Sequence, residues 1–333
     1  MRCFWAWRFG SGGGGLPVVH TYAILGYMKN KHLLGHIAAL GTICVWGFAY
    51  VAIVILLRAF TPVEILLFRF TLAAAALYII YPKSMGKTTW RQELHFAGAG
   101  LAGVTLYFLM QDFALLNTTA SNVGVIVAVA PVFTALLSWR LLRDSRPAGT
   151  FFLGAVIALG GLGLVSFAGN RVELNPLGDF LAVFAALCWA VYCVITKKIN
   201  GFGFHIIQTT RRIFLYGLLF LIPALLAMDF RLGLERFTEP QNVASFLFLG
   251  LGASAACFVF WNFSVQQLGP AKTSVYIYLV PLVTVTASVL LLGESVGLLK
   301  GIGIVFALAG LVISNRRGAA QKKACNFEEG MLL

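Results

Sequence analysis

The sequence predicts an all-α polytopic membrane protein in which about ten transmembrane helices form two inverted five-helix repeats. Of its 333 residues, 59% are hydrophobic and only 11% are charged, whereas soluble domains are usually about a quarter charged. Apolar stretches of roughly 20 residues, long enough to cross a bilayer, recur along the chain. The two halves also share residues at fixed spacings. We therefore expect lipid rather than water to be the solvent of this chain.

The predicted spans follow one another through short connections, many of which contain Pro or Gly. Only residues 83–94 and 229–243 form longer connections, so no soluble domain is expected between spans. The predicted spans are residues 33–57, 62–82, 95–116, 120–141, 148–168, 177–197, 204–228, 244–266, 271–292 and 298–315.

Lys and Arg residues set the predicted orientation, because short cytosolic loops of membrane proteins carry most of the positive charge. With a cytosolic N-terminus, 17 of the 25 Lys and Arg residues lie in cytosolic segments, five in external segments and three within spans. Both termini are therefore predicted to be cytosolic, in a multi-pass protein of the cell inner (plasma) membrane. The net charge of +13 is spread over these loops rather than gathered on one face, so nucleic acid is not an expected partner.

The two ends of the chain differ in composition from the predicted spans. Residues 1–31 are predicted to form a flexible basic N-terminal tail with a Gly-rich patch and no apolar stretch of spanning length. Met28 begins a compact basic segment before the first span, which leaves open a second interpretation, that the natural start is Met28. Residues 32–169 and 170–316 form the two predicted repeats, and residues 317–333 a cytosolic C-terminal tail.

The internal repeat appears when the chain is compared with itself. Trp46 and Trp189 are 143 residues apart, as are Arg69 and Arg212. From the third span onward the spacing is 150 residues, which relates Gly100-Leu101 to Gly250-Leu251 and Pro131 to Pro281. Each half holds five spans, an odd number, so the two halves must lie in opposite orientations. Inverted repeats of this kind recur among transporters, with the substrate site at the repeat interface.

These shared positions resemble those of the EamA family of the drug/metabolite transporter superfamily. The resemblance rests on a Trp in the first span, an Arg near the start of the second and a Pro in the fourth span of each half, and on Leu-Leu-Leu-Gly-Glu at 290–294. It covers about residues 33–316 and implies a ten-helix carrier, commonly an exporter of amino acids or related metabolites. Many relatives carry Glu before the mid-helix Pro, whereas this chain has Ala130 and Val280. A role of that Glu in coupling transport therefore cannot be assigned to this chain.

Candidate substrate-binding residues are aromatic, amide and arginine side chains within the spans. An intramembrane Arg costs at least about 2.5 kcal/mol, so it needs a reason. That reason is either a carboxylate contact in a cavity or a structural contact with helix-end carbonyls and headgroups. The aromatic side chains either line an amphipathic cavity or form interfacial belts. The candidates are Trp46, Tyr50, Arg69, Tyr107, Asn122, Trp189, Tyr192, Arg212, Trp261 and Tyr276.

Pro131 and Pro281 fall within predicted spans, where proline removes a backbone hydrogen bond. They are interpreted as hinges, with a static packing bend as the alternative. Asp112 and Asp179 could carry protons but are not predicted to do so, because both lie near span ends.

No catalytic residue, metal ligand or cofactor site is predicted. The chain contains no P-loop, HExxH or GxSxG motif, and its six cysteines show no CxxC spacing. The sequence therefore favours a secondary transporter that moves a small metabolite, an amino acid or related compound, outward across the cytoplasmic membrane by alternating access. Its expected partners are the small-molecule substrate and the lipid bilayer, and a homodimer is left open. The alternatives are a membrane-embedded enzyme and a non-transporting membrane scaffold.

Overall fold

The computed structural model describes residues 18–118, 120–167, 175–228, 230–283, 286 and 297–315. Within these ranges the chain is helical and contains no strand. Among the described residues, seven helices are long and apolar enough to cross a membrane, and two shorter apolar helices cover Gly149–Val165 and Gly301–Ser314. The seven are Asn30–Leu56, Pro62–Ile80, Trp90–Asn117, Val123–Leu142, Pro176–Asn200, Ile206–Ala227 and Pro240–Leu268.

The elements follow the predicted order closely. The first half contains α1 (Val18–Leu56), α2 (Pro62–Ile80), α3 (Trp90–Gly100), η1 (Leu101–Leu106), α4 (Tyr107–Asn117), α5 (Ala120–Val127), α6 (Ala130–Leu142) and α7 (Gly149–Phe167). The second contains α8 (Pro176–Asn200), α9 (Ile206–Ala227), η2 (Leu234–Thr238), α10 (Pro240–Leu247), η3 (Phe248–Ala256), α11 (Cys257–Leu268), α12 (Pro270–Ser274), η4 (Val275–Leu279) and α14 (Leu298–Asn315).

The structure and the predicted boundaries differ mainly at the N-terminus. α1 begins at Val18, so residues 18–31 of the predicted tail continue the first helix. Residues 1–17 and 317–333 lie outside the described residues. The predicted ninth span is described only at residues 271–283 and 286.

Two long helices change their hydrogen-bonding pattern at corresponding places. The π-helical segment η1 joins α3 to α4, and the π-helical segment η3 joins α10 to α11. The two overlap when residues 150 positions apart are compared, since Leu101 in η1 then falls on Leu251 in η3. π-Helical turns widen a helix and are frequent at functional sites.

The two predicted hinge prolines also stand next to helix irregularities. α5 ends at Val127, and Pro131 lies in the first turn of α6, where its missing N–H needs no partner. Pro281 follows the 3₁₀ segment η4. Pro131 therefore starts a new helix rather than kinking a continuous one, because the turn at residues 128–129 ends the preceding helix.

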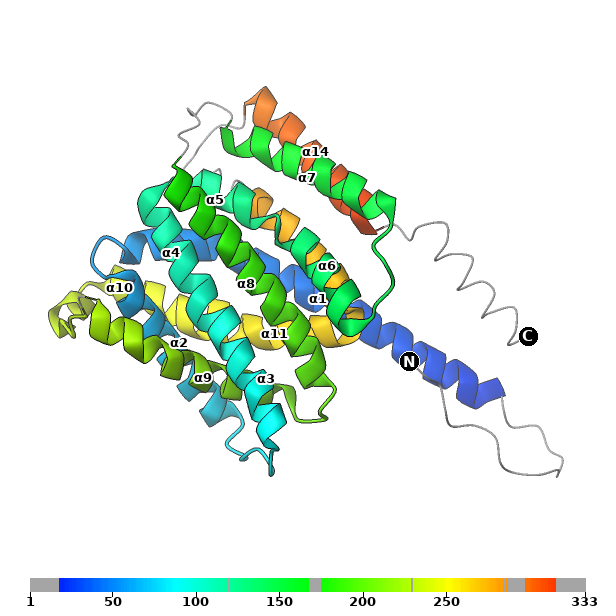
Figure 1. Ribbon diagram of the computed structural model, residues 1–333, viewed down its shortest axis with the longest axis horizontal. Helices are drawn as coiled ribbons and strands as arrows, with labels where there is room; N and C mark the ends of the chain where they lie inside the picture. The colour runs from blue at the N-terminus through cyan, green and yellow to red at the C-terminus, as the bar shows by residue number, and fades with distance from the viewer. Residues whose placement is uncertain are drawn as a thin grey trace.

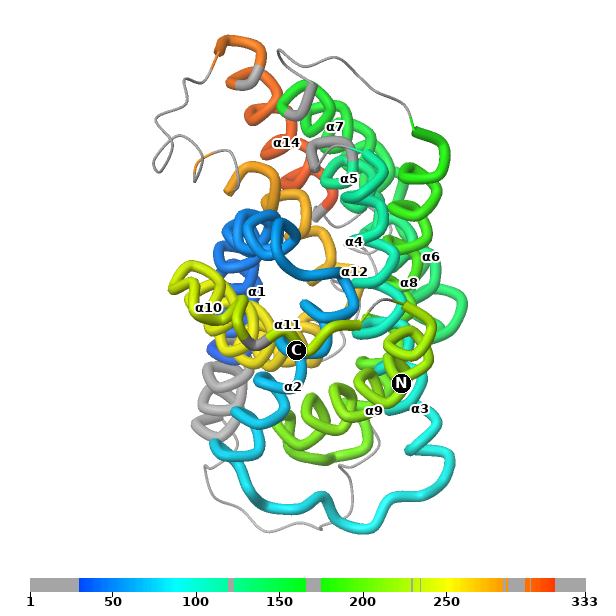
Figure 2. Tube along the Cα trace, turned by 90° about the vertical axis from the view of Figure 1, so that its left-hand side faces the viewer, coloured from blue at the N-terminus to red at the C-terminus, as the bar shows by residue number. Residues whose placement is uncertain are grey.

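The helices form a bundle with a peripheral helix pair at one end (Figures 1 and 2). α7 and α14 pack against each other at the top of both views, and α2, α3 and α9 lie at the bottom. Between them, α1 packs on α11 and α4 packs on α8. The connection from α1 to α2 and the segment η2–α10 lie at the left of Figure 1, and the C-terminal ends of α6, α11 and α14 lie at the right.

Small residues allow the backbones of α7 and α14 to approach closely. A Cβ atom built on Gly161 would lie 2.5 Å from Ala307 N and 2.6 Å from Gly303 O. A Cβ atom on Gly154 would lie 2.4 Å from Ser314 N. Close approach of this kind replaces the hydrophobic driving force that is absent between helices in lipid.

Large apolar side chains point outward from the bundle. On α7 and α14, Val156 and Val305 are 69% and 65% exposed, and on α9 Leu226 is 83% exposed. Such surface would be unfavourable in water but matches hydrocarbon. Together with the apolar helices, it identifies the chain as a membrane protein.

The α7–α14 contact predicts a difference between two neighbouring glycines. Gly161→Ala should destabilise the protein by about 1–3 kcal/mol, because its methyl group has no room at the helix contact. Gly160→Ala is the matched control, since a Cβ atom there meets nothing within 4 Å. Thermal unfolding of the purified protein in detergent measures the effect. Equal melting temperatures for the two variants would contradict the contact.

Candidate functional site

The start of α2 fixes the place of the first buried charge. Thr61 and Glu64 form a capping box, in which the Thr61 N–H donates to Glu64 Oε2 at 2.8 Å and the Glu64 N–H donates to Thr61 Oγ1 at 3.4 Å. Pro62 begins the helix, because its fixed φ suits the first turn. Arg69, seven residues further on, then faces the bundle interior and is only 2% exposed.

An aromatic cluster occupies the centre of the bundle. We call it the central aromatic cluster; its members are Trp46 of α1, Tyr107 of α4, Trp189 and Tyr192 of α8, and Phe258 and Trp261 of α11. The ring centroids of Trp46 lie 5.3 Å from Trp189 and 5.1 Å from Trp261, and Tyr107 lies 4.8 Å from Trp189. The two tryptophans 143 residues apart in the sequence therefore meet edge to face, at distances typical of favourable aromatic pairs.

Arg69 and Asp112 form a buried pair of opposite charges beside this cluster. Arg69 donates from Nε to Ser254 Oγ at 3.0 Å, and its guanidinium lies 4.5 Å from the ring centroid of Phe108. Asp112 is fully buried and interacts electrostatically with Arg69, Tyr50 and Tyr107. Among the described residues, Arg69 Nη1 and both carboxylate oxygens of Asp112 make no hydrogen bond of ordinary length, and the neutral Gln111 side chain interacts with the Asp112 carboxylate. We call Arg69 and Asp112 the buried charge pair.

A second polar group lies on the other side of the cluster. The Tyr192 hydroxyl donates to Asn262 Oδ1 at 2.6 Å, and Asn262 Nδ2 donates to Thr210 Oγ1 at 3.0 Å. Within the described part of the chain the indole N–H group of Trp189 has no acceptor, and that of Trp261 interacts with the Cys193 thiol. The centre of the bundle therefore offers free donors and acceptors against apolar ring faces, as a binding site for a small amphipathic molecule requires.

The other predicted arginine lies away from this centre. Arg212 forms an ion pair with Glu93, with Nη2 to Oε1 at 2.7 Å and Nε to Oε2 at 3.1 Å, and its side chain is 41% exposed. The Tyr216 hydroxyl also donates to Glu93, at 2.6 Å. Its neighbour Arg211 is buried and donates to the main-chain carbonyls of Tyr81 and Lys83, 2.9 Å each. Arg69 and Arg212 therefore have different surroundings, although the predicted repeat places them at equivalent positions.

The remaining candidates fall in three places. Tyr50 lies with the buried charge pair, as its interaction with Asp112 shows. Tyr276, in η4, bonds through its hydroxyl to His36 Nδ1 at 2.6 Å. Asn122 lies in α5, and its side chain is outside the described residues.

The bundle is closed where α2 begins. Glu64 is 1% exposed and pairs with Arg236 of η2, with Nη1 to Oε2 at 2.8 Å and Nη2 to Oε1 at 3.2 Å. Arg236 also donates to Ala59 O at 2.8 Å, and the Arg231 N–H donates to Glu64 Oε1 at 2.8 Å. Beside this ion pair the rings of Phe60, Phe68, Phe237 and Phe246 pack together, with ring centroids 5.0 to 6.2 Å apart.

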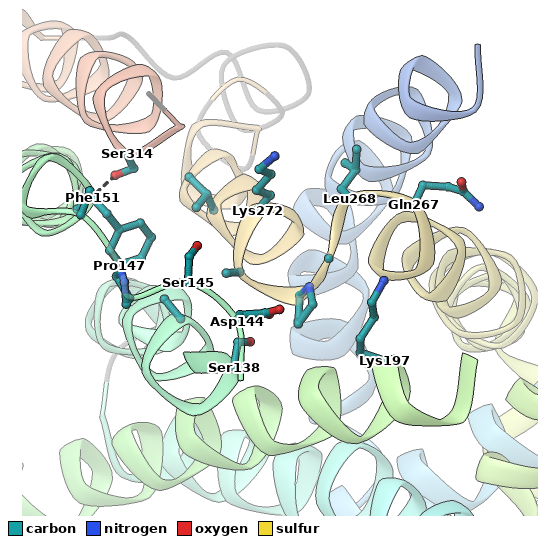
Figure 3. Close-up of a pocket in the computed structure, with 16 residues that line it drawn as sticks. Ser138, Asp144, Ser145, Pro147, Phe151, Lys197, Gln267, Leu268, Lys272 and Ser314 are labelled. Atoms are coloured by element: carbon teal, nitrogen blue, oxygen red, sulfur yellow. Dashed lines mark hydrogen bonds between the residues drawn. The ribbon is translucent and has the colours of Figure 1, made fainter. Parts of the chain in front are cut away.

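A pocket of about 380 Å³ opens at the opposite end of the bundle (Figure 3). Its wall includes Ser138, Asp144, Lys197, Lys272 and Ser314, from α6, the α6–α7 loop, α8, α12 and α14. In Figure 3 the Asp144 side chain extends toward the side of the pocket that carries Lys197, and Lys197 Nζ donates to Gln266 O at 3.0 Å. Partial burial raises the pKa of the Asp144 carboxyl, and the positive charge of Lys197 offsets part of that rise. Lys197 lies eight residues, or about 12 Å of helix, beyond Trp189 of the central aromatic cluster.

Comparison with known proteins agrees with this architecture. The model of the EamA-like transporter family matches residues 33–167 and 176–316. The chain belongs to the EamA-like transporter family. No group of three or more His, Cys, Asp or Glu residues that could hold a metal ion occurs in the described ranges.

Relatives of this EamA-like chain are named as transporters. An uncharacterized transporter of Archaeoglobus fulgidus is 29% identical over 85% of this chain and 97% of its own length. A protein of Streptantibioticus cattleyicolor named as a probable terminal-alkyne amino-acid exporter is 27% identical over 85% of this chain and 93% of its own length. A crystal structure with 18% sequence identity matches with a TM-score of 0.68, over 86% of this chain and 96% of that chain, and shows the shared fold.

Asp112 is the residue of this EamA-like site that sequence reasoning set aside. It lies five residues before the end of α4, yet it is fully buried, because α2 and α8 pack against α4. A signal was available. Asp112 and Asn262 are 150 residues apart, the spacing that relates the second halves of the two repeats.

Arg236→Gln should loosen the closed end of the bundle, because it leaves the buried Glu64 carboxylate without its ionic partner. If the closed state loses only about 1.4 kcal/mol of stability relative to the open state, the ratio of open to closed protein rises tenfold. Hydrogen–deuterium exchange of the amides at residues 230–239 should therefore speed up by about tenfold or more. Arg231→Gln is the matched control, since Arg231 contacts Glu64 only through its backbone N–H. Equal exchange in both variants would show that the ion pair does not hold this end closed.

Proposed function

We propose that this EamA-like protein is a secondary carrier that exports a small amino acid or related metabolite by alternating access, with about ten spans in two inverted halves. The central aromatic cluster carries this proposal, because both halves contribute to it and it presents free polar atoms beside apolar rings. Substrate sites of inverted-repeat carriers lie at such an interface near the middle of the membrane.

The helix contacts support the inverted repeat. α1 packs on α11, and its counterpart α8 packs on α4, the counterpart of α11. In the same way α2 packs on η3 and α9 packs on η1. Each half therefore places its first two spans against the third span of the other half. The two family matches, at residues 33–167 and 176–316, also fall within the proposed repeats 32–169 and 170–316.

The two ends of the bundle support alternating access. The Glu64–Arg236 ion pair and four phenylalanines close the end that the Lys and Arg distribution places outside. The pocket lined by Asp144 and Lys197 opens at the end placed in the cytosol. This arrangement corresponds to an inward-facing state, and transport requires a second state in which the closed end opens. Pro131 and Pro281, next to their helix irregularities, are proposed as the hinges.

Export and the class of metabolite are supported by the relatives. One of them is named as a probable terminal-alkyne amino-acid exporter, and its matched region covers 85% of this chain. Both termini are proposed to be cytosolic, and the membrane is proposed to be the cell inner membrane, because of the Lys and Arg distribution.

The export proposal is tested in cells that overproduce the protein. Such cells should resist toxic analogues of the exported amino acid, and proteoliposomes should exchange the labelled compound across the membrane. Trp46→Ala and Trp189→Ala should each lower exchange per inserted protein by about tenfold or more, because each removes a wall of the central aromatic cluster. A protein that exchanges nothing across a panel of amino acids and their analogues would contradict the proposal.

The orientation is tested by reporter fusions. A reporter fused after residue 316 should be cytosolic, and one inserted within residues 229–243 should be external, because cytosolic loops carry 17 of the 25 Lys and Arg residues. Finding both reporters on the same side of the membrane would contradict the ten-span inverted arrangement.

A further inference from the structure

We propose that Asp112 and Arg69 together bind the two charged ends of a zwitterionic substrate, with Asp112 as the residue that requires an ammonium group. This inference rests on the proposed carrier function, since it names the chemistry of the compound carried. Its first support is the position of the two charges. Arg69 is 2% exposed and Asp112 is fully buried, in the part of the bundle where both halves meet.

The free hydrogen-bonding atoms of the pair indicate a missing partner. Arg69 uses Nε for Ser254 Oγ and keeps Nη1 free, while the Asp112 oxygens make no hydrogen bond of ordinary length and interact with the neutral Gln111 side chain. Buried charged groups are normally fully hydrogen-bonded, because an unpaired one costs several kcal/mol. A substrate carboxylate would accept from Arg69 Nη1, and a substrate ammonium group would donate to Asp112.

Charge balance selects the zwitterion over compounds with one charge. The buried charge pair is neutral as a whole, so a bound zwitterion leaves the charge of the site unchanged. A bound carboxylate alone would pair with Arg69 and leave the charge of Asp112 uncompensated. A bound amine alone would pair with Asp112 and leave the charge of Arg69 uncompensated. An uncompensated charge in a low-dielectric site is strongly unfavourable.

The surroundings favour an apolar substituent on this zwitterion. Phe108 lies against the guanidinium of Arg69. Tyr107, which interacts with both charges, belongs to the central aromatic cluster, and its ring centroid lies 4.8 Å from that of Trp189. The position related to Asp112 in the other half is Asn262, whose amide already pairs with Tyr192 and Thr210. The acid therefore occurs on one side of the cluster, which would orient the bound molecule.

Isothermal titration calorimetry on the full-length protein in lipid nanodiscs tests this proposal. The ligands are L-leucine and L-phenylalanine, each with its deaminated acid (4-methylpentanoate, 3-phenylpropanoate) and its decarboxylated amine (3-methylbutylamine, 2-phenylethylamine). At least one amino acid should bind the wild-type protein about tenfold or more tightly than both of its one-charge analogues. Asp112→Asn should weaken that binding by about tenfold or more and abolish the preference over the acid, since a charged hydrogen-bond partner is lost.

Two further variants keep the result interpretable. Asp112→Glu retains the charge and should retain the preference for the zwitterion, whereas a general defect in folding would affect it as it affects Asp112→Asn. Glu235→Gln, at an exposed carboxylate in η2, should bind like the wild-type protein. Wild-type protein that binds the acid or the amine as well as the amino acid, or that binds none of the six compounds, would overturn the inference. So would an unchanged preference in Asp112→Asn. Export of a compound with a single charge would be consistent with the proposed carrier function but would contradict the requirement for a zwitterionic substrate.

Discussion

The structure depends on the burial of one arginine where the two halves of the bundle meet. A guanidinium within a membrane is unfavourable unless other groups take up its charge and its N–H donors. Around Arg69 the first half supplies Asp112 and the ring of Phe108, and the second half supplies the Ser254 hydroxyl. The contact of α2 with η3 places these groups together, so the charge at the centre requires both halves.

Close packing of the backbones makes that arrangement possible. A Cβ atom on Gly250 would lie 2.6 Å from Leu72 Cδ2, and one on Gly100, its counterpart, would lie 2.7 Å from Gly217 N. The first two helices of each half can therefore reach the third helix of the other. Between these contacts the aromatic rings fill the centre, and the ends remain separate: an ion pair at one and a pocket at the other. Two ends that differ in this way around one shared centre are what a carrier needs in order to open one side at a time.

Much of the fold could be predicted from the sequence, because membrane spans depend on composition and length. α2, α7, α8, α9 and α14 lie within a few residues of their predicted bounds, and the tryptophan match correctly selected two side chains that meet. Pro131 indicated an irregularity in the fourth span, because proline removes a backbone hydrogen bond. The π segments could not be predicted, since they depend on packing between distant helices. The importance of Asp112 could not be predicted for a similar reason, because the position of a residue near the end of a span does not reveal whether neighbouring helices bury it. The partners of Arg212 and Arg69 differ because Glu93 and Asp112 come from different parts of the third span, which spacing alone does not reveal.

Alternating access requires the two ends of the bundle to open in turn around the shared centre. Double electron–electron resonance measures this in nanodiscs, with one spin-label pair at Arg58 and Glu235 beside the ion pair and a second at Arg146 and Gln267 near the pocket, in a background without native cysteines. When Arg236→Gln breaks the ion pair, the first distance should lengthen while the second shortens, because both report one equilibrium between two states. A first distance that lengthens while the second stays the same would contradict alternating access, since the two ends would then move independently.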